Sequence, residues 1–251
     1  MTRQRRPRWW RVSVAGGMIG LMLCLSGCVY LRLLQLKRQL ADFDHNFVLS
    51  TASGLHLRCL EPVLLTSDLR WLGFEPATIR RLGTSEQWHI RWVTQPAPTA
   101  AVKGTFEIAF DLTFSAGRLS ALTLADKYFG LLPKDVVIAA IKSLGSGNVD
   151  RKQRSMQSSV ALPASASPMF WPDRKMVAAI LGPPTEEHQE SGRIVSRFHC
   201  ISADPSGKGK DIQIKLVFDA ITGKLLQTSG QLPVGNINLE FTPPGEGSPE
   251  P

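Results

Sequence analysis

Residues 105–124 read TFEIAFDLTFSAGRLSALTL, and this stretch decides the class of fold. Its first half alternates between apolar and polar side chains, and the apolar set is Phe106, Ile108, Phe110, Leu112 and Phe114. Such alternation places the apolar side chains on one face of a strand. Ser115-Ala116-Gly117 is typical of a tight turn, and residues 118–124 return. The stretch therefore predicts an antiparallel hairpin with one buried face.

The residues around this hairpin predict a first α+β unit at residues 48–130. Gly73 and Gly83 each follow a leucine, as glycines that end helices often do. The expected elements before the hairpin are a β-hairpin at 47–60, a short helix at 68–72, a second helical piece at 77–82 and a strand at 88–93.

A helix and a linker are expected at residues 131–168. Pro133 presets the first turn of a helix over 131–144, and Gly145 is expected to end it. The Ser/Ala/Pro-rich residues 146–168 predict a linker, with one strand at 158–162.

The chain then repeats the order of its first unit at residues 169–241. A helix from Asp173 ends at Leu181-Gly182-Pro183, and alternating strands follow at 193–201 and 212–218. A turn at 219–223 leads to a returning strand at 224–232. The predicted fold class is α+β: two tandem units, each of short helices followed by an antiparallel three- or four-stranded meander, preceded by an N-terminal signal or anchor helix.

The second unit, VAAILGPPTEEHQESGRIVSRFHCI…IQIKLVFDAITGKLLQ, resembles the small-lipoprotein domain of the SmpA/OmlA (BamE) type. That family pairs a helix ending LG-x-P with a strand, a long hairpin and an F-D-x-x-G-x-L return. The resemblance covers residues 173–232, with a fainter copy at 68–126, and two such units also resemble the tandem-repeat fold of the β-lactamase-inhibitor proteins. It implies an outer-membrane lipoprotein that assists assembly without catalysis. The family's glycine-led first helix is missing here, so only the class carries over and no functional residue does.

The N-terminus predicts secretion and lipid attachment. Five arginines and no acidic residue stand in the first eleven positions, before an apolar run from Val12 to Leu25. This is the pattern of a signal peptide. The run ends in Leu25-Ser26-Gly27-Cys28, which resembles the bacterial lipobox. Cleavage after Gly27 would remove residues 1–27 as a lipoprotein signal peptide, and Cys28 would carry the lipid.

An uncleaved signal anchor is the alternative. Residues 12–31 are about the ~20 needed to span a bilayer, and Arg32 would stop the span. In either case residues 28–47 predict a membrane-proximal helix, whose apolar stripe is Leu33, Leu36, Leu40, Phe43 and Phe47. The Pro/Gly/Glu-rich residues 242–251 predict a disordered tail.

The net charge bears on the class of partner, and the cysteine positions bear on disulfide formation. The formal charge of +8 falls to +3 without the five N-terminal arginines (8 − 5 = 3), so nothing favours nucleic acid as a partner. Cys59 and Cys200 sit at inward strand positions, as buried free thiols or, alternatively, as a disulfide.

No residue pattern predicts catalysis, a cofactor or a metal. The motifs HExxH, CxxC, GxSxG, P-loop and GxGxxG are missing from the sequence. His56, His89 and His199 fall on the polar side of their strands, which predicts solvated histidines. The acidic groups Asp42 and Asp44, and Glu186, Glu187 and Glu190, are expected on the surface. The aromatic residues Trp88, Trp92, Phe106, Phe110 and Phe114 are expected in the core, with a ligand cleft as the alternative.

These patterns favour a membrane-anchored periplasmic lipoprotein that acts as a non-catalytic binding or scaffold module. Its expected partners are membrane lipid, through acylated Cys28, and an envelope protein whose identity stays open. The outer membrane facing the periplasm is the expected location, and the inner membrane is the alternative if the helix is uncleaved. The competing functions are a lipid or small-ligand carrier, and a single-pass protein with an unrecognised active site.

Overall fold

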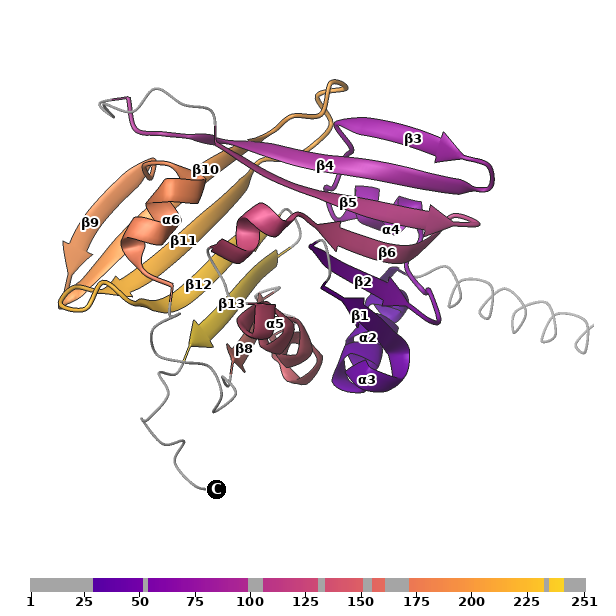
Figure 1. The fold of residues 1–251 in the computed structure, drawn as a ribbon, viewed down its shortest axis with the longest axis horizontal. Helices are drawn as coiled ribbons and strands as arrows, with labels where there is room; N and C mark the ends of the chain where they lie inside the picture. The colour runs from indigo at the N-terminus through magenta and orange to yellow at the C-terminus, as the bar shows by residue number, and fades with distance from the viewer. Residues whose placement is uncertain are drawn as a thin grey trace, which may run out of the picture.

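The computed structural model describes residues 29–51, 54–98, 106–130, 134–150, 155–160, 172–232 and 235–241. Its strands form one mixed sheet in the order β1-β2-β6-β5-β4-β10-β11-β12-β13-β8-β7, with β3 added beside β4 and β9 beside β10 (Figure 1). The strands are β1 (Phe47–Ser50), β2 (Leu55–Cys59), β3 (Thr78–Leu82), β4 (Ser85–Gln95), β5 (Glu107–Ser115), β6 (Arg118–Leu124), β7 (Asn148–Asp150), β8 (Ser155–Val160), β9 (Glu186–Glu190), β10 (Arg193–Ser202), β11 (Ile212–Asp219), β12 (Leu225–Leu232) and β13 (Gly235–Phe241). The helices are α2 (Val29–Ala41), α3 (Phe43–Asn46), α4 (Thr66–Trp71), the 3-10 helix η1 (Asp126–Gly130), α5 (Lys134–Ser146) and α6 (Arg174–Leu181).

The predicted hairpin of β5 and β6 is confirmed. Ala116 and Gly117 connect the strands with φ angles of 49° and 74°, which a two-residue hairpin turn of the primed type requires. Leu112 and Phe114 of β5 are 2% and 1% exposed, on the face where the alternation placed them.

One face of the sheet is apolar, and the helices cover it. Trp88 and Phe114 pack with ring centroids 4.7 Å apart. The same cluster of buried side chains includes Leu69 of α4 and Val177 of α6, so both short helices lie on this face. Residues from the first and second halves of the chain thus share one hydrophobic core.

The prediction of two tandem helix-plus-meander units is wrong. The C-terminal halves of β4 and β10 pair antiparallel, from Trp92 with Ser202 to Gln95 with His199, and join both halves into one sheet. β4 is longer than its neighbour β3, and β10 is longer than its neighbour β9. Beyond the ends of these short neighbours, the backbone groups of β4 and β10 form hydrogen bonds with each other. Alternation reveals which side chains point inward, but not which distant strand supplies the backbone partners.

One smaller prediction is also wrong, and two are correct only in part. Residues 78–82 form strand β3 rather than a helix, because a turn at Gly83 (φ 61°) folds them back onto β4. The strand expected at 158–162 is β8, which begins at Ser155 and pairs in parallel with β13, but the expected linker also contains β7. The helix expected to stop at Gly145 ends one residue later, at Ser146, and Gly145 lies where α5 crosses α2. A Cβ atom there would lie 2.2 Å from the backbone nitrogen of Ala41.

Helix α2 is tied firmly to the folded body. Arg32 donates two hydrogen bonds of 2.6 Å to the carboxylate of Asp68, which is 2% exposed. Gln39 donates to the carbonyl of Glu61, and Leu33 and Leu36 pack against the core. The body therefore begins within the first turn of α2. Among the described residues, no helix is long and apolar enough to cross a membrane.

Several sequence predictions lie outside the described residues. They concern the signal or anchor helix, the lipobox Leu25-Ser26-Gly27-Cys28 and the tail at 242–251.

Candidate functional site

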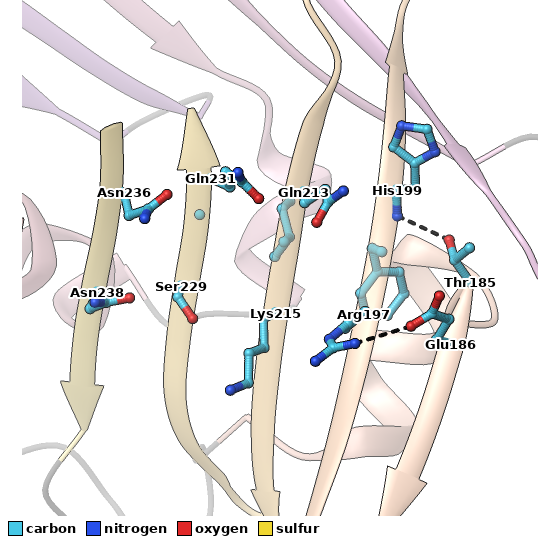
Figure 2. Close-up of a pocket in the computed structure, with 13 residues that line it drawn as sticks. Thr185, Glu186, Arg197, His199, Gln213, Lys215, Ser229, Gln231, Asn236 and Asn238 are labelled. Atoms are coloured by element: carbon cyan, nitrogen blue, oxygen red, sulfur yellow. Dashed lines mark hydrogen bonds and ion pairs between the residues drawn. The ribbon is translucent and has the colours of Figure 1, made fainter. Parts of the chain in front are cut away.

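The described part of the chain offers one broad polar surface, on the sheet face away from α6. Figure 2 shows it as side chains standing on β10 to β13 beside β9. They line a shallow hollow of about 550 Å³. We call this surface the polar face; its labelled members are Thr185, Glu186, Arg197, His199, Gln213, Lys215, Ser229, Gln231, Asn236 and Asn238.

The polar face is built by strand register. His199 lies opposite Gln213, Gln213 opposite Gln231, and Gln231 opposite Asn236. A second row runs in the same way through Arg197, Lys215, Ser229 and Asn238. Because side chains alternate along a strand, both rows point away from the core that Phe198 and Leu216 enter.

The contacts at one edge of the polar face fix its shape. Arg197 pairs with Glu186 at 3.2 Å, and the Oγ1 atom of Thr185 accepts a hydrogen bond of 2.9 Å from the backbone of His199. The imidazole of His199 lies 3.4 Å from a carboxylate oxygen of Asp211. No hydrogen bond or ion pair with the described residues engages Lys215, which is exposed near the centre of the hollow. The row of Arg197, Lys215 and Ser229 thus holds a cation that has no partner among the described residues.

The side chains of the polar face are suited to recognising a polar partner. Glutamine and asparagine amides both donate and accept hydrogen bonds, and lysine attracts carboxylates as a flexible point charge. The described residues contain no group of three side chains able to hold a metal ion. A partner offering carboxylates and hydrogen-bonding backbone groups would match the surface.

The three strand histidines lie where the alternation placed them, on the polar side. His89 contacts the carboxylate of Asp111 at 2.8 Å, and His56 lies 3.1 Å from the hydroxyl of Thr123. The sequence did not reveal either partner, since only the register of β4, β5, β6 and β2 brings them together.

The remaining candidate residues are structural. Trp88, Trp92 and Phe114 are buried in the core, as the alternation predicts, although Trp88 and Phe114 also line a hollow of about 320 Å³ beside β3 and α4. Glu187 pairs with Arg174, and Asp44 with Lys142, at the surface.

Cys59 and Cys200 are both free. Four strand spacings separate β2 from β10 in the sheet, far more than a disulfide can bridge. Cys200 is fully buried, and burial together with the nearby Asp211 carboxylate raises the pKa of its thiol to about 11. Cys59 is only half-buried, although the sequence pattern predicted that its side chain points into the core.

Comparison with known proteins gives no match: no family model, no curated protein and no solved structure matches the chain.

Proposed function

We propose that the chain is a lipid-anchored protein of the bacterial envelope that binds a protein partner and catalyses no reaction. Acylated Cys28 holds it at the membrane, at the outer membrane facing the periplasm, and the polar face receives the partner. The likeness of residues 173–232 to the SmpA/OmlA type supports the same class.

The observation that carries the anchor is the pairing of Arg32 with Asp68. Because of this ion pair, the first turn of α2 already belongs to the folded body. A membrane span that is not cleaved off could therefore use only apolar residues before Val29. Residues 12–28 number 17, the lower limit of the ~17–25 residues that a membrane helix needs. The lipobox ends at residue 28, directly before the helix begins. A cleaved and acylated Cys28 therefore fits the body better than a span that continues to Leu31.

The partner surface follows from the contrast between the two faces of the sheet. One face is filled by core side chains beneath helices, and the other presents amide side chains and Lys215 on regular strands. Rigid strands hold such groups in fixed register, which a recognition surface needs.

The packing speaks against the carrier alternative. A carrier needs an apolar cavity between the helices and the sheet. Trp88, Phe114 and Phe218 occupy much of that layer and are at most 1% exposed. The hollow of about 580 Å³ that remains between α6 and the sheet is lined in part by the charged side chains of Asp173, Arg174 and Glu187. The two His–Asp contacts, His89 with Asp111 and His199 with Asp211, lie apart on the sheet and do not share one cleft.

Membrane fractionation of Cys28→Ser tests the anchor. We expect the wild-type chain in the membrane fraction, with diacylglycerol on Cys28 by mass spectrometry, and the variant to remain unprocessed and without lipid. A wild-type chain that is unacylated and keeps residues 1–27 would refute the proposal and establish the signal anchor.

Crosslinking and pull-down from membranes test the partner surface. Lys215→Glu reverses the free charge of the polar face, and we expect it to lose the partner that the wild-type chain recovers. Lys175→Glu makes the same change on an exposed position of α6 and should keep that partner. Equal recovery by both variants would remove the polar face from the proposal.

A further inference from the structure

A small apolar patch surrounds the beginning of α2. Tyr30, Leu31 and Leu34 of α2 are 59%, 45% and 38% exposed, and Trp71 of α4 is 43% exposed. The rings of Tyr30 and Trp71 meet edge to face with centroids 5.3 Å apart. We call these four residues the α2 patch. Exposed apolar side chains gathered in this way indicate a contact with a partner or a membrane.

Resting on the proposed anchor, we infer that the α2 patch lies in the interfacial layer of the bilayer and sets the orientation of the body on the membrane. The chain itself supplies the argument for this occupant. Tyr30 is two residues from Cys28, and the apolar run of residues 12–25 ends three positions before Cys28. Whether that run is cleaved or retained, the bilayer begins within a few residues of the patch.

The chemistry of the α2 patch matches the membrane surface. Tyrosine and tryptophan concentrate at the boundary between lipid and water, because their rings are apolar and each carries one polar group. The leucines extend the apolar area along the first two turns of α2. Gln35 and Arg38 continue the exposed side of the helix with polar groups, so the apolar character fades with distance from Cys28.

The packing of α2 explains why this contact would fix an orientation. Arg32 and Leu33 hold the helix against α4 and the core, so the patch cannot turn independently of the body. One lipid anchor alone leaves a protein free to tilt. A second, rigid contact beside the anchor removes that freedom and presents the polar face in one direction.

Fluorescence quenching in reconstituted vesicles tests the contact. The mature, lipidated chain, without residues 1–27, is placed in vesicles of phosphatidylethanolamine and phosphatidylglycerol that also contain phosphatidylcholine brominated on its acyl chains. We expect bromine to quench the wild-type fluorescence more than that of Trp71→Phe, because Trp71 is 43% exposed whereas Trp88 and Trp92 are buried in the core. Trp171, the other tryptophan of the mature chain, is the same in both proteins. Equal quenching of the two proteins would overturn the inference.

Two further variants make the test specific. Leu34→Ser should lower the quenching towards that of Trp71→Phe, while its urea unfolding midpoint stays close to the wild-type value. Ile221→Ser changes a side chain that is 94% exposed on the turn between β11 and β12 and should leave the quenching unchanged. Vesicle flotation separates the two proposals. A chain that floats without quenching at Trp71 overturns only the orientation, and a wild-type chain that does not float overturns the anchor as well.

Discussion

Replacing Asp68 with asparagine should destabilise the protein strongly. The carboxylate is 2% exposed and accepts two hydrogen bonds from Arg32 and one of 2.8 Å from the backbone nitrogen of Leu65. Asparagine keeps the shape but removes the charge that faces the guanidinium of Arg32, whose side chain is 15% exposed. Breaking a buried ion pair from one side costs about 3–5 kcal/mol. We expect about 3 kcal/mol here, which lowers Tm by about 6–12 °C in a chain of this size.

The loss should depend on pH in a defined direction. Burial opposes ionisation of Asp68, but the hydrogen bonds from Arg32 and Leu65 outweigh it and hold the pKa of the carboxyl below its ordinary value. A lowered pKa contributes stability above the unfolded value of about 4, and that stability disappears as the pH falls through the folded value. The difference between wild type and Asp68→Asn should therefore be largest near neutral pH and shrink below about pH 4.

Urea unfolding followed by circular dichroism, at several pH values, measures this difference. Asp44→Asn is the matched control, since it makes the same change in the ion pair between Lys142 and Asp44, which is 2.8 Å long and whose side chains are 41% and 84% exposed. Such a pair contributes at most about 1 kcal/mol. If Asp68→Asn costs no more than this control, α2 is not part of the folded body, and the argument that the body begins beside Cys28 fails.

Two further changes test the packing. Gly145→Ala should destabilise the protein by about 1–3 kcal/mol, because its new methyl group meets the backbone of α2. Gly230→Ala is the control in the same thermal unfolding experiment, since Gly230 has open space at the Cβ position. Equal melting temperatures of the two variants would contradict the close crossing of α2 and α5. Iodoacetamide at pH 8 should alkylate the half-buried Cys59 before Cys200, whose pKa of about 11 and complete burial leave it neutral and shielded until the protein unfolds. Rapid alkylation of Cys200 in the folded protein, seen by peptide mass spectrometry, would refute this.

Local elements were predictable where side-chain alternation was clean. Residues 106–114 specify their own strand and its buried face, and Asp173 caps α6 through a 2.9 Å hydrogen bond from the backbone of Met176. Strands without such a pattern were missed. Every residue of β3 and of β9 is exposed, so no apolar period marks them, and only pairing with β4 and β10 makes them strands.

The polar face was only partly visible in the sequence. Gln213 and Lys215 alternate with Ile212, Ile214 and Leu216, which showed that polar groups leave the core on that strand. The sequence did not show the rest of the polar face, because the rows that join these residues to His199 and Asn238 depend on the register between strands. Register in a large sheet follows from turns and long-range pairing, which the single sequence does not specify.

If the chain is exported as we propose, the parallel pairing of β8 with β13 has a consequence for its folding. A secreted chain crosses the inner membrane unfolded with its N-terminal part leading, so β8 emerges about 80 residues before β13, its parallel partner (155 + 80 = 235). The antiparallel hairpin of β5 and β6 can close as soon as it emerges, since its strands are neighbours in the chain. Strand β8 meanwhile exposes an unpaired edge, which favours aggregation. A periplasmic chaperone that shields residues 155–160 until translocation ends would therefore raise the yield of folded protein.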